Sequence, residues 1–155
     1  MPCQAAKKLA IQLVRTNRSV YKDLPFVLRD DQDVFDAALN YRWGGYSPLM
    51  NATPRLRDIE RNVYQSVKKA GGSAFKHASK RLRQDYKVCL RACQIDFRAY
   101  NHVLMSVKKR PEFRLAVVKM GVLDLATTEM LKDRDLVLES LKNNRYAFSS
   151  IEDTD

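Results

Sequence analysis

A segment of about 25 residues recurs along this chain, and this repeat constrains the fold more than any other feature of the sequence. Each copy is introduced by a short joint: an apolar residue, one or more cations, usually an acid, and an apolar residue that opens the next segment. The joints read VLRDDQDV (27–34), RLRDIERNV (55–63), RLRQDYKV (81–88), SVKKRPEF (106–113) and MLKDRDLV (130–137).

The spacing of the opening residues is nearly constant. Val34, Val63, Val88, Phe113 and Val137 are separated by 29, 25, 25 and 24 positions. A step of 24 residues back from Val34 leads to residue 10, in KLAIQLVRTN. The sequence therefore predicts about six repeats, which restart near residues 10, 34, 63, 88, 113 and 137, the last of them truncated.

Within a repeat the apolar pattern is helical. In RNVYQSVKKAGG, Val63 and Val67 are four residues apart and share one face of a helix. Gly71 and Gly121 follow such stripes and suit the left-handed conformation of a helix C-terminus. A shorter apolar-periodic segment, such as 73–83, comes next. Each repeat is therefore predicted to be a helix, a tight turn and a second, shorter helix.

Helix pairs of this length cannot bury their apolar stripes alone, so neighbouring repeats must stack. We predict an all-α fold without a sheet, built as an α-solenoid of stacked helix-turn-helix repeats of about 24–29 residues. Residues 1–150 would form one repeat domain, followed by an acidic, disordered tail at 151–155. The alternative is a compact all-α bundle whose regular period is incidental.

The stretch ERNVYQSVKKAGGSAFKHASKRLRQDYKVCLRA resembles an uncharacterised helical-repeat family with the consensus DxxVVLxAVxxxGxALxxASxxLRxD. The repeats at 34–57 and 113–137 match it more loosely, and the repeat at 89–110 lacks the glycine. Such repeats are similar to those of proteins from intracellular bacteria, protists and large DNA viruses. The resemblance implies the helical fold and no particular activity.

The net charge of +10 is unevenly distributed. Residues 58–110 hold 13 Lys or Arg against 4 Asp or Glu, whereas 133–155 hold 3 against 6. A structural interpretation places the cations at the negative ends of short helices, with Asp85 or Glu112 at the start of the next helix. A functional interpretation places them on a basic ridge that binds phosphate or acidic protein. The candidate ridge consists of Lys68, Lys69, Lys80, Arg81, Arg83, Lys108, Lys109 and Arg110.

The longest insertion in the array holds Trp43, in NYRWGGYSP. Loops of this kind often carry binding contacts, so Trp43 is a second binding candidate. An aromatic lid over the core is the alternative role for this side chain.

Residues for catalysis or metal binding are sparse. His77 and His102 lie at corresponding places in successive repeats, and Cys89 and Cys93 have the spacing of small residues on one apolar helix face. The sequence contains no GxSxG, HExxH or phosphate-loop motif. We predict no catalytic residue, no metal, no cofactor and no small-molecule substrate, and hence a protein that is not an enzyme.

The few cysteines favour a reducing, intracellular setting, either a host cytoplasm or the interior of a virus particle. No secretory signal is recognised at the N-terminus, and no apolar run is long enough to span a membrane.

The leading functional hypothesis is a non-enzymatic interaction and assembly module that docks on other proteins. Examples would be a small structural subunit of a larger assembly such as a virion, or a bacterial effector module. The alternative is nucleic-acid binding through the basic repeats at 58–110.

Overall fold

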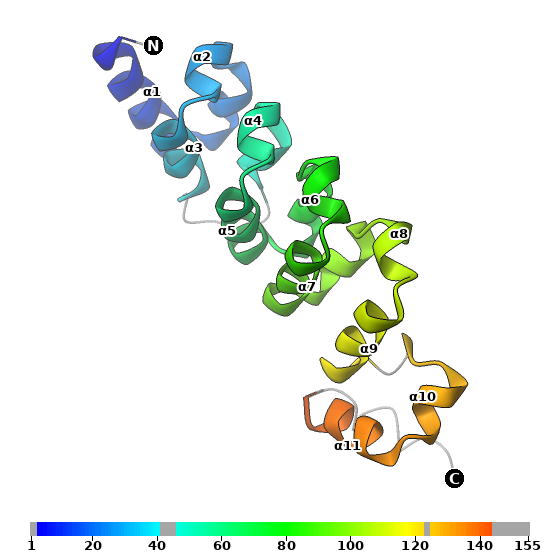
Figure 1. Ribbon diagram of the computed structural model, residues 1–155. Helices are drawn as coiled ribbons and strands as arrows, with labels where there is room; N and C mark the ends of the chain where they lie inside the picture. Colours follow the sequence, from blue (N-terminus) through cyan, green and yellow to red (C-terminus); the bar gives the residue numbers. More distant parts are fainter. Residues whose placement is uncertain (1–2, 41–45, 123–124, 144–155) are drawn as a thin grey trace. The chain divides into compact units, whose positions relative to one another are not determined.

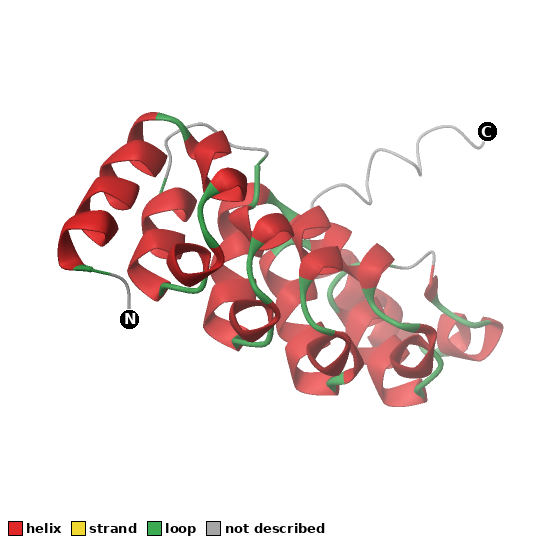
Figure 2. Cartoon of the chain, turned by 90° about the horizontal axis from the view of Figure 1, so that it is seen from above, coloured by secondary structure: helices red, strands yellow, loops and turns green. Residues whose placement is uncertain are grey.

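The computed structural model describes residues 3–40, 46–122 and 125–143. These residues form α- and 3-10 helices joined by short turns, without a β-strand among them (Figure 2), which confirms the all-α class. No helix in the described ranges is both long and apolar enough to cross a membrane. Contacts divide the chain into an N-terminal unit, Met1–Val103, and a C-terminal unit, Leu104–Asp155. A single solenoid domain over 1–150 stays a prediction, and its acidic tail lies outside the described residues.

In the N-terminal unit, long helices pack one after another, each against the next (Figure 1). They are α1 (Gln4–Thr16), α3 (Gln32–Leu39), α5 (Glu60–Ala70) and α7 (Tyr86–Ile95).

A second row consists of 3-10 helices, which also contact one another in order and pack against the long helices. They are η1 (Arg18–Asp23), η2 (Pro48–Asn51), η3 (Gly72–His77) and η4 (Phe97–His102).

Short α-helices connect each 3-10 helix to the following long helix: α2 (Phe26–Arg29), α4 (Pro54–Arg57) and α6 (Lys80–Gln84). The predicted second helix at 73–83 is therefore two elements, η3 and α6. The break falls at Ala78–Ser79, because the Ser79 hydroxyl accepts the Leu82 N–H (3.2 Å) and starts a new helix.

In the described part of the C-terminal unit, a short helix precedes a longer one twice, α8 before α9 and α10 before α11. Its helix α9 packs against α8 and α11, and α10 packs against α11. The bounds of its helices are α8 (Met105–Lys108), α9 (Pro111–Lys119), α10 (Thr128–Lys132) and α11 (Arg134–Asn143).

The opening residues of the long helices form the core. Val34, Val63, Val88 and Phe113 are at most 2% exposed, and Ala10 occupies a buried site on α1. The residues four positions later are buried as well, so each long helix turns one apolar stripe inward. The burial predicted from the repeat is confirmed at these positions.

The last repeat differs from the prediction by one residue. Leu136 is buried there, and Val137 is only half-buried. The cause is the helix cap: the Asp133 carboxylate accepts the Leu136 N–H (3.1 Å), as Asp85 accepts the Val88 N–H (3.1 Å) in α7. The residue three positions after the capping aspartate faces the core, and in α11 this residue is Leu136.

Two adjacent glycines shape the turn after α5. Gly71 has a φ of 93°, as predicted for a helix C-terminus, and Gly121 has a φ of 101°. Gly72 is needed for a different reason, because a Cβ there would lie 2.3 Å from the Ala99 backbone nitrogen. The backbones of η3 and η4 therefore meet at Gly72.

A polar clasp links successive repeats of the N-terminal unit. An aspartate that follows one short helix binds a hydroxyl group and an arginine at the start of the next short helix. The two clasps are Asp30 with Thr53 and Arg55, and Asp58 with Ser79 and Arg81.

In the second clasp, the Arg81 Nε lies 3.0 Å from the Asp58 carboxylate, and an Arg81 terminal nitrogen donates to the Asp58 carbonyl (3.0 Å). The Ser79 hydroxyl and the Arg81 guanidinium hold the pKa of the Asp58 carboxyl below its ordinary value. The side chain of Ser79 thus has two roles: it caps α6, and it binds Asp58 of the preceding repeat. The residue that corresponds to Ser79 before α8 is Leu104, and its side chain makes no capping hydrogen bond.

Substitution of Gly72 by alanine tests the close approach of η3 and η4. We expect Gly72→Ala to lower the free energy of unfolding by about 1–3 kcal/mol, because the added methyl overpacks this contact. Urea unfolding followed by circular dichroism measures the change. The exposed neighbour provides the control, since Ser73→Ala should stay within about 0.5 kcal/mol of wild type. Equal effects of the two substitutions would contradict the proposed contact.

The clasp predicts a second stability difference. Ser79→Ala removes both the cap of α6 and the bond to Asp58, so we expect a loss of about 1–2 kcal/mol in urea unfolding. Ser106→Ala is the control, because Ser106 is exposed in α8, at the position that corresponds to Arg81. A loss below about 0.5 kcal/mol for Ser79→Ala would show that the clasp does not stabilise the array.

Candidate binding surface

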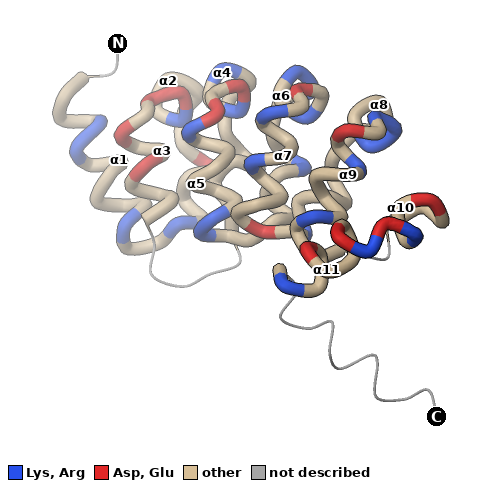
Figure 3. Tube along the Cα trace, turned by 60° about the horizontal axis from the view of Figure 1, so that its bottom comes forward, with Lys and Arg blue, Asp and Glu red and all other residues tan. Residues whose placement is uncertain are grey.

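The whole net charge of the chain belongs to the N-terminal unit. Residues 1–103 contain nineteen Lys and Arg against nine Asp and Glu, whereas residues 104–155 contain nine of each. The excess is greatest in residues 61–103, with ten cations against two acids. Figure 3 shows Lys and Arg on the short helices α4 and α6. A field of this sign attracts acidic partners.

The predicted ridge residues of α6 have different roles. Lys80 and Arg81 begin α6 rather than end a short helix, which corrects the structural interpretation, and Arg81 pairs with Asp58 in the clasp. Lys80 is exposed, and Arg83 is half-buried with a buried Nε that has no hydrogen-bond partner. The acid that follows, Asp85, caps α7 through the Val88 N–H, as predicted.

Lys68 and Lys69 are exposed in the last turn of α5, where the helix dipole favours positive charge. Lys69 also donates to the side-chain oxygen of Asn40, directly after α3.

These two lysines are separated from α6 along α5. Asp58 ties α6 to the beginning of α5, whereas Lys69 is nine residues beyond Glu60, which corresponds to roughly 14 Å along the helix axis. The structure therefore does not bring Lys68 and Lys69 together with Arg81. Within the N-terminal unit, the residues of the predicted ridge therefore form two separate groups at opposite ends of α5 and not one continuous ridge.

The remaining predicted residues lie elsewhere. Lys108 ends α8, Lys109 follows it, and Arg110 precedes α9, all in the C-terminal unit. Glu112 occupies the first turn of α9, as predicted. Trp43 lies outside the described residues.

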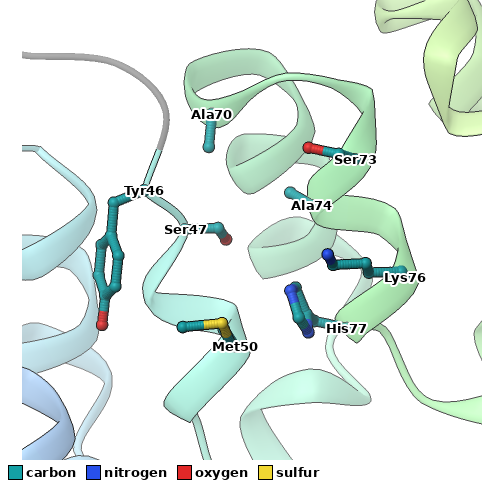
Figure 4. Close-up of a pocket in the computed structure, with 8 residues that line it drawn as sticks. All are labelled: Tyr46, Ser47, Met50, Ala70, Ser73, Ala74, Lys76 and His77. Carbon is teal, nitrogen blue, oxygen red and sulfur yellow. The ribbon is translucent and has the colours of Figure 1, made fainter.

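A pocket between η2 and η3 brings together polar residues that the sequence did not single out as a site (Figure 4). Its volume is about 140 Å³. It is lined by the segment leading into and through η2, by the end of α5, and by η3: Tyr46, Ser47, Met50, Ala70, Ser73, Ala74, Lys76 and His77.

Hydrogen bonds fix the η2 side of this pocket. The buried Ser47 hydroxyl oxygen accepts the Leu49 N–H (3.3 Å), and the Asn51 amide donates to the Tyr46 hydroxyl (2.8 Å). The Arg18 guanidinium lies 5.3 Å from the centre of the Tyr46 ring. The wall of η2 is thus held in place before any ligand binds.

His77 lies among basic groups, and its pKa reflects this environment. Burial lowers the pKa of His77 below its ordinary value of 6.5, and electrostatic interactions with the nearby basic groups Lys76, Arg57, His102 and Arg83 lower it further. All four of these neighbours are basic groups. At neutral pH the imidazole is therefore neutral in a positive environment.

Weak sequence signals explain why this pocket was missed. The sequence assigned His77 to repeat register, and the structure does place His77 and His102 at the last positions of η3 and η4. Only the packing of η2 against η3 shows that His77 also lines a pocket with Ser47, thirty residues earlier in the chain.

The cysteines lie apart from this pocket. Cys89 and Cys93 are buried in α7, on its apolar face as predicted. Among the described residues, no three His, Cys, Asp or Glu side chains are grouped so that they could hold a metal ion.

Comparisons of the chain with protein-family models, curated protein sequences and solved structures found no match. The helical-repeat family indicated by the sequence therefore stays a prediction.

The positive environment of His77 predicts its titration. Nuclear magnetic resonance should show a pKa below 6.5 for His77, and Lys76→Gln should raise this pKa because it removes one neighbouring charge. Lys22→Gln is the matched control, because Lys22 occupies in η1 the position of Lys76 in η3. A wild-type pKa at or above 6.5 would contradict the arrangement.

Proposed function

We propose that this chain is a non-enzymatic interaction and assembly module whose N-terminal unit docks on an acidic protein surface. The observation that carries the proposal is the charge difference between the units, +10 in residues 1–103 and zero in residues 104–155. Rows of packed helices offer a wide surface for such docking without a chemical centre. A structural subunit of a virion or a module of a bacterial effector are settings in which such a protein would act.

Exposed apolar residues favour a protein partner. Leu9 and Leu13, four residues apart on α1, are 57% and 41% exposed, and Phe26 and Val27 on α2 are 60% and 52% exposed. Protein interfaces combine large apolar side chains with a polar rim, whereas binding to a phosphate backbone relies on charge. The N-terminal unit offers both kinds of side chain.

The second candidate function is nucleic-acid binding, and the ten cations against two acids in residues 61–103 support it. Lys68, Lys69 and Lys80 are exposed and make no ion pair with an acid among the described residues. Such binding would weaken steeply with salt, because each neutralised phosphate releases counterions.

Charge reversal tests whether retention of acidic proteins depends on Lys68 and Lys69 themselves or only on the net charge of the chain. The full chain is immobilised and exposed to nuclease-treated native lysate at low salt, and the retained proteins are quantified. We expect Lys68→Glu with Lys69→Glu to reduce retention of acidic proteins by roughly tenfold, or about 1.4 kcal/mol. Lys132→Glu with Lys142→Glu makes the same change of net charge in the C-terminal unit and should leave retention within about twofold.

Two outcomes would overturn the protein-docking proposal. Equal loss in both double variants would show that only overall charge matters. Retention that requires intact nucleic acid, together with salt-dependent binding of an oligonucleotide by the purified chain, would instead assign the basic surface to nucleic acid.

A further inference from the structure

The pocket between η2 and η3 is lined by hydrogen-bond donors from two successive repeats. Figure 4 shows the side chains of Lys76 and His77 on η3 facing the same space as Ser47, which precedes η2. A lysine ammonium has three N–H donors and no acceptor. The Ser47 oxygen already accepts the Leu49 N–H, so its proton is available to a ligand.

The charge around this space is of one sign. No carboxylate lines the pocket in the part of the chain that the structure describes, and the nearby basic groups Lys76, Arg57, His102 and Arg83 all lower the pKa of His77. Like charges held together disfavour the protonated forms of one another, and a bound anion relieves this repulsion.

We propose that this pocket binds a small tetrahedral oxyanion, as sulfate, inorganic phosphate or the phosphate group of a small phosphomonoester. Lys76 would neutralise the charge of the anion, and the hydroxyls of Ser47 and Ser73 would donate to its oxygens. His77 would supply a further donor and, once protonated, a second positive charge.

The size of the pocket fits this class of ligand. Its volume of about 140 Å³ is several times the roughly 30 Å³ that a water molecule occupies in the liquid. It is smaller than the roughly 300–1,000 Å³ of pockets that enclose whole metabolites or drug-sized ligands. The pocket is therefore large enough to accommodate a compact ion or a single phosphate group.

Binding of the anion should be linked to protonation of His77. An anion beside the imidazole favours its charged form and raises its pKa, so binding should tighten as the pH falls from about 8 to about 5.5. Sulfate is the suitable probe for this linkage, because it keeps its charge over that range. Inorganic phosphate changes its own charge there.

The test is a titration of the full chain with sodium sulfate at constant ionic strength, with sodium chloride as the balancing salt. Binding is followed by the chemical shifts of backbone amides in η2 and η3. We expect saturable binding that Lys76→Gln weakens by roughly tenfold, as for the loss of one charge-assisted hydrogen bond. Lys22→Gln, at the corresponding position of η1, should change the Kd by less than about twofold.

His77→Gln tests the linkage itself. This variant should bind sulfate more weakly at about pH 5.5 and lose the pH dependence of the wild type. Thermal unfolding confirms that each variant is folded. Separate titrations with inorganic phosphate and with glycerol phosphate show whether the pocket requires a free ion or also accepts an esterified one.

Three results would overturn the inference: no saturable shift in η2 and η3, an equal effect of Lys76→Gln and Lys22→Gln, or an unchanged pH dependence in His77→Gln. The inference does not rest on the proposed docking function. Lys76→Gln leaves Lys68 and Lys69 intact, so loss of sulfate binding with normal protein retention would separate the two.

Discussion

Burial of the apolar stripe on each long helix is the constraint on which the rest of this structure depends. A helix of about ten residues is only marginally stable in water, and its stripe is shielded only when the next helix lies against it. Val34, Val63 and Val88 meet this requirement in the N-terminal unit, since each is almost completely buried. The 3-10 helices cover the same stripes from a second row, so every repeat depends on its neighbours.

Polar contacts between neighbouring repeats fix the register in which their helices pack. The apolar stripe alone would tolerate a shift of one helix along another, whereas Asp58 can reach Ser79 and Arg81 in only one register. The paired amides of Gln32 and Asn62, which bond each other at 2.8 and 3.1 Å, hold α3 and α5 in the same way. The exposed ion pair of Asp58 and Arg81 contributes modestly to stability, and the directionality of these polar contacts supplies the alignment.

The positive charge of the N-terminal unit arises in part from this architecture. Arginines recur at the joints because they bind the preceding repeat, as Arg55 and Arg81 do. Cations beyond this requirement, Lys68, Lys69 and Lys76 among them, give the surface its field and the η2–η3 pocket its character. The two proposed binding roles therefore depend on side chains added to a repeat whose first requirement is packing.

The sequence by itself determined the all-α class, the repeat period and most of the buried positions, because helical spacing is a local property that is visible in neighbouring residues. It missed the split of each second helix at residues such as Ser79, and it placed the last core residue at Val137 rather than Leu136, since capping decides these details. Only the tertiary structure decided that Lys68 and Arg81 lie in separate groups and that Ser47 and His77 share a pocket. These relations depend on how one repeat packs against the next, and the identity of neighbouring residues along the chain does not encode them.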